Sequence, residues 1–255
     1  MLEHEGIITG INSGLGKYLF GNMNFYGFSR ETDIKSTKQN KFKTIIHCAY
    51  NKDRDINSNN LYDYMYDNLL LTHELLNIPH DKFIYISTVD VYPKKGQLCK
   101  EDDIIKIKDV DGIYGITKLM SEQIVINNCK NHLILRPTAL LGPYIKPNSL
   151  VKMLNRKNEK LNLSINSKLN YVHHKDVLMF INYALRNDTT GIFNLASKTN
   201  ISLSKICIEF NIPDVSFGNY FYDIGNIDNS KIVKIMPEFN KTSIKVVEDF
   251  IQEQT

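Results

Sequence analysis

Near its amino terminus the chain reads Gly6-Ile7-Ile8-Thr9-Gly10-Ile11-Asn12-Ser13-Gly14-Leu15-Gly16, and a helical pattern at residues 17–20 follows at once. The apolar start predicts a short buried strand. A strand, a glycine turn and a helix in this order can hold a pyrophosphate, because glycines allow close backbone approach and the helix amino terminus offers unpaired N–H groups. The spacing T-G-x-x-x-G-x-G differs from G-x-G-x-x-G, so the turn could equally be a loop with helix-capping glycines.

Strand and helix patterns alternate along the first part of the chain. Short apolar runs predict strands, and longer segments with apolar residues on one helical face predict helices. The predicted strands are residues 6–10, 24–28, 43–49, 82–87 and 132–136, and the predicted helices are residues 17–20, 61–77 and 114–128. This alternation predicts an α/β fold with a doubly wound parallel sheet of the Rossmann type. No convincing helix fits between the second and third strands, so that crossover is expected to be a loop or missing.

The pattern becomes less regular after Gly142. Helices are predicted at residues 149–156, 176–186 and 203–210, strands at 169–174 and 192–195, and an amphipathic helix at 243–252. We therefore expect residues 1–142 to form a dinucleotide-binding core. Residues 143–255 would complete that core, at about 169–197, and form a small C-terminal substrate lobe.

Open α/β sheets collect their functional groups at the carboxyl ends of the strands. The glycine turn, Ala49, Thr88 and Pro137 each lie at such an end. We expect these residues to meet at one edge of the sheet.

Tyr114 and Lys118 are four residues apart at the start of a predicted helix, which places both side chains on one helix face. An ammonium beside a phenol favours the phenolate. This matters because a free tyrosine, with a pKa of about 10, is a poor acid–base catalyst at neutral pH. The spacing alone is common, and a solvated helix face explains it too. Thr88 at a strand end and the glycine turn make the pair a predicted proton-transfer site.

The composition is ordinary for a globular protein, with 42% hydrophobic and 23% charged residues and a net charge of +3. Because Lys and Arg are spread along the chain, we predict neither nucleic acid nor a membrane as a partner. The four cysteines form no C-x-x-C pair, and the chain shows no signal-peptide pattern and no long apolar run. A cytoplasmic location is therefore predicted.

Ser29 and Arg30 follow the second predicted strand. At this position an acidic residue would hold the ribose 2′-OH of NAD, whereas an arginine accommodates the 2′-phosphate of NADP. A surface arginine would also explain Arg30. NADP is preferred over NAD as the predicted cofactor.

Several motifs occur in a fixed order along the chain. They are Thr9-Gly10-x-x-x-Gly14-x-Gly16, His47-Cys48-Ala49, Asn68, Ser87-Thr88-x-x-Val91-Tyr92, Tyr114-x-x-x-Lys118, Leu135-Arg136-Pro137 through Leu141-Gly142-Pro143, Tyr171-Val172-His173-His174-Lys175-Asp176-Val177 and Ile227-Asp228-Asn229-Ser230-Lys231. The ordered set resembles the extended short-chain dehydrogenases/reductases, in the NAD-dependent epimerase/dehydratase family that acts mainly on nucleotide sugars. The resemblance covers nearly the whole chain.

The resemblance implies a role for individual residues. Tyr114 would be the catalytic acid/base, Lys118 its partner, and Thr88 a hydrogen-bonding group for the substrate oxygen. The implied cofactor-binding residues are Gly10, Asn12, Ser13, Gly14, Leu15, Gly16, Ser29, Arg30, Cys48, Ala49, Tyr50, Asn68, Ser87, Tyr114, Lys118, Pro137, Thr138 and Leu140. The implied substrate-binding residues are Thr88, Val89, Asp90, Tyr114 and His173.

Departures from the family pattern reduce the number of family reactions that we expect this chain to catalyse. The glycine spacing is that of the shorter-chain branch, and the short chain leaves a reduced substrate lobe. Val89 stands where related sugar 4,6-dehydratases carry an acid, so net elimination of water is not expected. We expect an NAD(P)-dependent reductase or epimerase of a nucleotide-linked deoxy- or ketosugar. The reductase is preferred, because a small lobe leaves little room to rotate a ketosugar.

Other functions fit the same residues. A carbonyl reductase of a non-sugar substrate is one, since fold does not fix substrate. A non-catalytic NADP-sensing regulatory protein is another, although relatives of that kind often lose the Tyr or the Lys, and this chain keeps both. Relatives commonly form homodimers through the helices at 60–77 and 114–130, so we expect a homodimer by analogy.

His173 and His174 invite a metal interpretation. On a strand, adjacent side chains face opposite sides, so the two rings cannot easily share one ion. No Cys or acidic cluster completes a tetrahedral set, and we predict no metal. His47, within an apolar strand, is expected to be packed in the core or adjacent to the cofactor.

Overall fold

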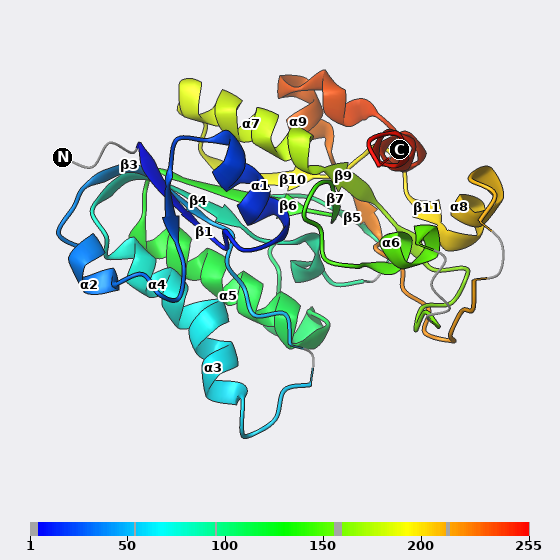
Figure 1. Cartoon of the computed structure of the whole chain (residues 1–255), viewed down its shortest axis with the longest axis horizontal. Helices are drawn as coiled ribbons and strands as arrows, with labels where there is room; N and C mark the ends of the chain where they lie inside the picture. Colours follow the sequence, from blue (N-terminus) through cyan, green and yellow to red (C-terminus); the bar gives the residue numbers. More distant parts are fainter. Residues whose placement is uncertain (1–4, 54, 95, 156–159, 213–214, 255) are drawn as a thin grey trace.

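The central strands of this computed structural model bury side chains on both of their faces. The structure describes residues 5–53, 55–94, 96–155, 160–212 and 215–254. Six parallel strands form the main sheet, in the order β10-β6-β4-β3-β1-β2 (Figure 1). They are β1 (Gly6–Thr9), β2 (Tyr26–Phe28), β3 (Phe42–His47), β4 (His80–Ile86), β6 (His132–Pro137) and β10 (Gly191–Leu195).

Neighbouring residues of a strand point into two different apolar clusters, because side chains alternate across a strand. Ile8 and Ile46 pack on one face with α1 (Gly14–Asn22) and α7 (His174–Arg186). Ile7 and Ile45 pack on the other face with α4 (Leu71–Leu76) and α5 (Gly112–Asn128). Figure 1 shows α1 and α7 on one side of the sheet and α3 to α5 on the other. The predicted doubly wound α/β fold is confirmed.

Two of the connections differ in detail from the sequence expectation. The crossover between β2 and β3 contains a single helical turn, α2 (Ile34–Thr37), which Asp33 caps by accepting the N–H groups of Lys35 and Ser36. The predicted helix at 61–77 is a succession of three segments. They are α3 (Leu61–Met65), the π-helix η1 (Tyr66–Leu70) and α4. A π-helical turn often marks a functional site, and this one carries Asn68.

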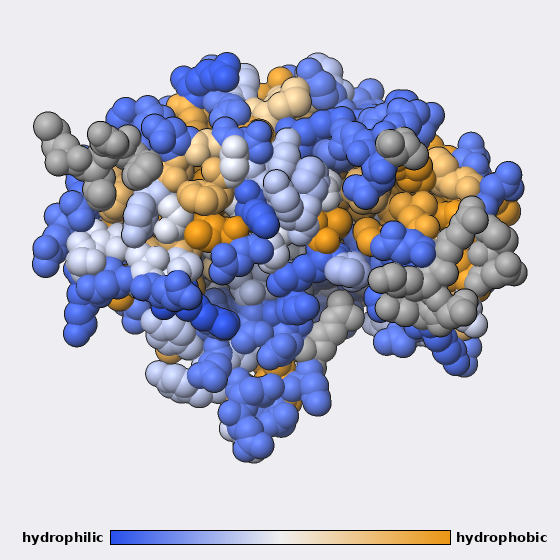
Figure 2. Space-filling view, in the orientation of Figure 1, coloured by the Kyte–Doolittle hydropathy of each residue, from blue (hydrophilic) through white to orange (hydrophobic). Residues whose placement is uncertain are grey.

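The C-terminal part of the chain builds a third apolar cluster. Buried Leu150, Ile206 and Phe250 belong to it. Its elements are β7 (Ala139–Leu141), α6 (Ser149–Leu154), β8 (Lys168–Leu169), β9 (Tyr171–His173), β11 (Ile201–Ser202), α8 (Leu203–Glu209) and α10 (Ser243–Gln252). The predicted amphipathic helix at 243–252 is therefore present as α10. Figure 2 shows apolar side chains on the surface around α6 and α8, whereas the surface over α3 is hydrophilic.

A fourth apolar cluster is formed around Val91, Tyr92 and Leu119. The remaining elements are η2 (Val89–Val91), β5 (Leu98–Cys99), η3 (Ile107–Asp109), β12 (Asn226–Ile227), α9 (Ser230–Ile235) and η4 (Pro237–Asn240). Within the described ranges, no helix combines the length and the apolar character that crossing a membrane requires.

Candidate active site

The glycine turn after β1 is a tight backbone cradle. Gly10 and Gly14 have φ angles of +75° and +56°, in the left-handed region that favours glycine. A Cβ on Gly10 would lie 2.9 Å from the backbone nitrogen of Ala49, and a Cβ on Gly16 would lie 2.3 Å from the carbonyl oxygen of Gly10. Positions 10 and 16 therefore need glycine, because the backbone packs too closely there for a side chain. Asn12 is exposed, Ser13 precedes α1 and Leu15 enters the core.

A loop from the C-terminal part of the chain covers the start of α1. The Gly14 N–H donates to the carbonyl oxygen of Tyr144 at 2.8 Å. The Lys17 ammonium lies 4.6 Å from the centroid of the Tyr144 ring. Tyr144 itself has a φ of +63°. The carbonyl oxygen of Tyr144 thus accepts the hydrogen bond of one of the N–H groups at the amino terminus of α1.

Neutral hydrogen bonds hold the end of β3 against the end of β1. Thr9 Oγ1 accepts the N–H groups of Cys48 and Ala49 at 3.0 and 2.9 Å. The Thr9 hydroxyl lies 2.8 Å from Nδ1 of His47, and Nε2 of His47 lies 3.1 Å from the hydroxyl of Thr72. Burial lowers the pKa of His47 to about 3, so the ring is neutral. The expectation that His47 is packed in the core is confirmed.

Asn68 fixes the loop that follows β3. Its side-chain oxygen accepts the N–H of Asn51 at 2.8 Å, and its side-chain nitrogen donates to the carbonyl of Asn51 at 3.1 Å. Asn68 is buried in η1. It therefore shapes the Cys48–Tyr50 side of the edge through backbone contacts. The Cys48 thiol stays neutral, because burial raises its pKa to about 12.

Arg30 forms an ion pair at the end of β2. Its Nη2 lies 2.5 Å from Oδ2 of Asp67, which belongs to η1. The Arg30 side chain is 82% exposed. The neighbouring Ser29 hydroxyl accepts the N–H of Glu31 at 3.2 Å. The predicted 2′-phosphate partner is thus engaged by a carboxylate that the sequence did not point to.

Lys118, one helical turn after Tyr114 on α5, is buried at the carboxyl end of β4. Its ammonium donates to the carbonyl of Ile86 at 2.8 Å. It lies 4.8 Å from the ring centroid of Tyr85 and 5.4 Å from that of Tyr50. Burial lowers the pKa of Lys118 to about 8. The ammonium is therefore stabilised by a carbonyl and two aromatic faces.

Tyr114 lies between Thr88, Asp90 and Tyr50. The Tyr50 ring centroid is 5.7 Å from that of Tyr114. Burial raises the pKa of Tyr114 well above 10, with further increases from Tyr50, Asp90 and Tyr85 and a decrease from the Thr88 hydroxyl that bonds to it. The sequence argument expected Lys118 to favour the phenolate. In the structure burial has the largest effect on this pKa and raises it, so Tyr114 is a protonated phenol.

Asp90 connects the site to the C-terminal part of the chain. Tyr222 donates its hydroxyl proton to Oδ1 of Asp90 at 3.0 Å. The Lys94 ammonium lies 3.1 Å from the same oxygen and 3.9 Å from the centroid of the Tyr222 ring. The Asp90 N–H donates to Oγ1 of Thr88 at 3.1 Å. Val89 instead packs into the apolar cluster below, so only its backbone is available to a ligand.

The end of β6 closes the edge beside β4. Pro137 is the last residue of β6 and pairs with Leu195 of β10. The Thr138 N–H donates to the carbonyl of Leu195 at 3.0 Å, and its hydroxyl donates to Oδ1 of Asn170, also at 3.0 Å. Leu140 lies in β7 and packs against the main core. These residues thus form a rigid wall of the edge.

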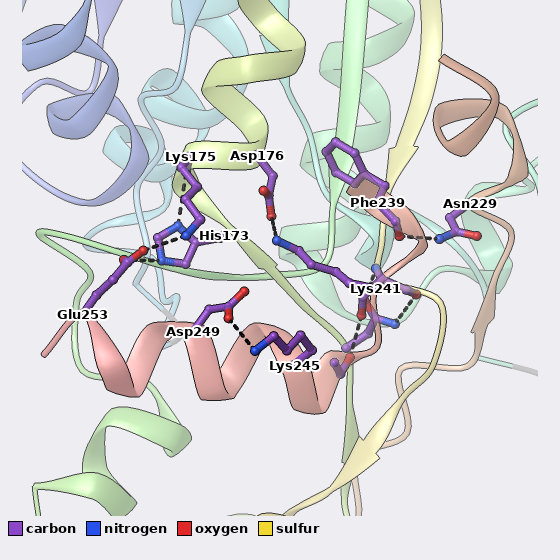
Figure 3. Close-up of polar contacts among 12 residues, drawn as sticks. His173, Lys175, Asp176, Asn229, Phe239, Lys241, Lys245, Asp249 and Glu253 are labelled. Carbon is purple, nitrogen blue, oxygen red and sulfur yellow. Dashed lines mark hydrogen bonds and ion pairs between the residues drawn. The ribbon is translucent and has the colours of Figure 1, made fainter. Parts of the chain in front are cut away.

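His173 has a different environment from the other predicted site residues. Its Nδ1 accepts the N–H of Lys175 and caps α7, and its Nε2 lies 2.7 Å from Oε2 of Glu253. Figure 3 shows His173 and Lys175 converging on Glu253 while Lys241 reaches Asp176. His173 joins α7 to the C-terminal segment, and we leave it out of the proposed substrate site. Across the described residues, no group of three or more His, Cys, Asp or Glu side chains could hold a metal ion.

Sequence reasoning missed several residues that shape the site. Glu122 lies one helical turn after Lys118 on α5, so helical spacing would have found it. Tyr85 and Ile86 precede the Ser87-Thr88 motif and contact Lys118. Tyr222 had no sequence signal, since it is 132 residues from its partner Asp90.

Comparisons with known proteins agree with this geometry. The family model described as "NAD dependent epimerase/dehydratase family" matches residues 9–196. No curated protein sequence matches significantly. One similar solved structure is dTDP-4-dehydrorhamnose reductase from Bacillus anthracis in complex with NADP, which is 20% identical, with a TM-score of 0.79 over 99% of this chain and 100% of that chain.

Two further solved structures share the fold. UDP-glucuronic acid 4-epimerase from Bacillus cereus, in complex with UDP-glucuronic acid and NAD, is 19% identical, with a TM-score of 0.76 over 98% of this chain and 99% of that chain. A dTDP-4-dehydrorhamnose reductase from Clostridium acetobutylicum is 17% identical, with a TM-score of 0.79 over 98% of this chain and 99% of that chain. With its glycine cradle, its Tyr114–Lys118 helix and a match to the family model from residue 9 to residue 196, the chain belongs to the NAD-dependent epimerase/dehydratase family.

Proposed function

We propose that this protein is an NAD(P)-dependent reductase or epimerase of a nucleotide-linked deoxy- or ketosugar, with reduction of a ketosugar as the favoured reaction. The observation that carries the proposal is the placement of Tyr114 beside the Thr88 hydroxyl, with Lys118 one turn later on α5 and bound to the carboxyl end of β4. A neutral phenol within hydrogen-bond reach of a substrate oxygen can give its proton to that oxygen as it becomes an alkoxide during reduction. Both structural relatives named as reductases support the same preference.

The residues at the edge fit a dinucleotide. Gly10 and Gly16 let the turn pack closely against the chain's own backbone, whereas nothing lies within 4 Å of a Cβ on Gly14, so a pyrophosphate could approach the turn at Gly14. Lys118 would contact the nicotinamide ribose, and Cys48, Ala49, Tyr50 and the wall of Pro137, Thr138 and Leu140 would line the cofactor. A bound nicotinamide supplies the hydride. Opening the Gly14 contact with Tyr144 would free a further N–H for a phosphate.

The protein residues handle the proton and the position of the substrate. Thr88 would hold the carbonyl oxygen of the sugar, and Tyr114 would transfer its proton to that oxygen as hydride reaches the carbonyl carbon. The C=O bond becomes C–OH, the sugar carbon is reduced and the phenolate takes a proton back from water. Lys118 would stabilise that phenolate while it lasts. Asp90, held by Lys94 and Tyr222, would face the sugar ring.

The preference for NADP over NAD remains part of the proposal. Its support is the neutral Ser29 and the cationic Arg30 at the end of β2, where an acidic residue would repel a 2′-phosphate. Asp67 is the opposing feature, because it pairs with Arg30. An exposed pair of this kind is weak and can exchange partners when a phosphate binds.

Purified protein incubated with NADPH or NADH and a panel of nucleotide-4-ketosugars tests the proposal. Loss of reduced cofactor together with a new sugar alcohol identifies a reductase. Interconversion of two nucleotide sugars without net cofactor consumption identifies an epimerase. In Tyr114→Phe we expect turnover to fall by at least about 100-fold, because general acid catalysis contributes on that order. Undiminished hydride transfer in Tyr114→Phe would refute the role of Tyr114.

A further inference from the structure

Glu122 and Arg136 form a buried ion pair directly behind the Tyr114 site. Arg136 in β6 donates through Nε and Nη2 to the two carboxylate oxygens of Glu122, at 3.0 and 2.6 Å. The side chains are 3% and 0% exposed. Removing two charges from water is costly, and only good geometry with further hydrogen bonds compensates for it. The structure provides both.

The carboxylate of Glu122 is also bound to the end of β4. Ser87 donates its hydroxyl proton to Oε1 of Glu122 at 2.5 Å. One turn earlier on α5, Lys118 donates to the carbonyl of Ile86. Two side chains of α5 therefore hold Ile86, the last residue of β4, and Ser87 directly after it, and the next residue of the chain is Thr88. Any shift of α5 along β4 would change how Tyr114 meets Thr88.

The hydrogen-bond network extends from the ion pair to the edge strand of the sheet. Arg136 Nη1 donates to the hydroxyl of Tyr92 at 2.7 Å, and Tyr92 lies 2.9 Å from Oδ1 of Asn194 in β10. The N–H of Asn194 donates to Oε1 of Glu101 at 2.9 Å. The ion pair and its hydrogen bonds thus connect α5 to the end of β4, to β6 and, through Tyr92, to β10.

Glu122 also supplies negative charge to Lys118. The groups that face the ammonium are Ile86 and Tyr85 from β4, His47 and Cys48 at the end of β3, Tyr50 after it, and Glu122 from α5. His47 and Cys48 are neutral at neutral pH. The charge of Glu122 therefore opposes the effect of burial on Lys118.

We propose that Glu122, held by Arg136, is a positioning residue for the reaction: it fixes α5 against the end of β4 so that Tyr114 meets Thr88. The inference rests on the proposed function, because it assigns Glu122 a task in that reaction. It predicts two separable effects. Geometry depends on the length of the side chain at 122, and the protonation of Lys118 depends on its charge.

Two variants separate these effects. Glu122→Gln keeps the length and removes the charge, whereas Glu122→Asp keeps the charge and shortens the side chain. In Glu122→Gln we expect the alkaline limb of kcat to move to lower pH by about one unit, since a nearby charge changes a pKa by about that amount. In Glu122→Asp the limb stays in place and kcat falls, and KM for the sugar changes little in both variants. Glu238→Gln, an exposed carboxyl on η4, is the matched control.

A second readout needs no turnover. The affinity for NADPH can be measured from the fluorescence of the cofactor. Because Lys118 would contact the cofactor, this affinity should weaken when Lys118 loses its proton, and it should do so at a lower pH in Glu122→Gln than in the wild type. If the wild type turns over no nucleotide sugar but this shift occurs, the proposed substrate is wrong and the role of Glu122 stands. A folded Glu122→Gln with both pH profiles unchanged would overturn the effect of the Glu122 charge on Lys118.

Thermal unfolding checks that each variant is folded. Glu122→Gln could fail to fold because Arg136 is left unpaired. In that case Glu122→Asp and Ser87→Ala are used to test the positioning role of Glu122. Both keep the ion pair charged and loosen the contact between α5 and β4. A reduced kcat with unchanged KM supports the positioning role, and an unchanged kcat in both variants overturns it.

Discussion

The glycine-turn half of the sheet edge is held together by neutral hydrogen bonds and close backbone contacts, whereas the Tyr114 half depends on buried charges. Thr9, His47 and Asn68 fix the first half without an ionised group. Lys118 and the Glu122–Arg136 pair fix the second half. The difference suggests that added volume disturbs the first half most, while a change of charge or pH disturbs the second. Four experiments examine this contrast.

The largest expected effect on the free energy of unfolding comes from protonation of His47, which would place a charge in the first half of the sheet edge. Burial lowers its pKa to about 3, against about 6.5 in an unfolded chain. Between these pH values only the unfolded state binds the proton, so stability falls as the pH falls from about 6.5 toward 3. The loss amounts to about 4 to 5 kcal/mol at the acid end. Urea unfolding across this range measures it, and His47→Asn should lack most of the dependence. An equal acid slope in His47→Asn would exclude His47 as the cause.

The next effect concerns the buried charge of Lys118 in the second half. Its pKa is about 8 in the folded protein and about 10.4 in an unfolded chain. Between these values the unfolded state keeps a proton that the folded state has released, so stability rises with pH. The gain in the free energy of unfolding is about 3 kcal/mol. Turnover should fall over the same pH range, because Lys118 loses its charge. Denaturant unfolding and activity are measured together, with Lys118→Met as the comparison. If Lys118→Met shows the same rise, another group is responsible.

Adding a methyl group to the glycine turn tests how tightly the first half of the sheet edge is packed. Gly10→Ala places a Cβ 2.9 Å from the Ala49 nitrogen at a φ of +75°. We expect a loss of about 1 to 3 kcal/mol in the free energy of unfolding, and weaker cofactor binding. Gly21→Ala in α1 is the matched control, since nothing lies within 4 Å of its Cβ, and it should stabilise the helix slightly. Thermal denaturation and cofactor titration compare the two. Equal behaviour of both variants would contradict the close packing of the turn.

The smallest effect is expected at the exposed Arg30–Asp67 pair. Arg30→Ala should reduce the preference for NADPH over NADH by up to about 10-fold, with less than about 1 kcal/mol change in stability. Asp67→Ala should change the preference in the opposite direction, because it releases Arg30. The ratio of kcat/KM for the two cofactors measures both. A ratio unaffected by either substitution would remove the argument for NADP.

Much of the fold was predictable from short-range patterns. The alternation of apolar residues on two faces gave the buried parallel strands, as at Ile7 and Ile8. The glycines at 10, 14 and 16 gave the turn, and the four-residue spacing placed Tyr114 and Lys118 on one helix. These features depend on backbone sterics and on side-chain direction within a single element, which neighbouring residues determine. The single turn of α2 and the π-helical η1 were not predictable in this way.

The sequence by itself determined the parallel sheet, the positions of the strand ends and the helix that carries Tyr114 and Lys118. Only the tertiary structure decided the charge state of Tyr114, the pairing of Arg30 with Asp67 and the placement of His173 beside Glu253. A pKa depends on burial and on charges a few ångströms away, and folding brings those charges from distant parts of the chain, as it brings Tyr222 to Asp90. No local pattern in the sequence carries that information.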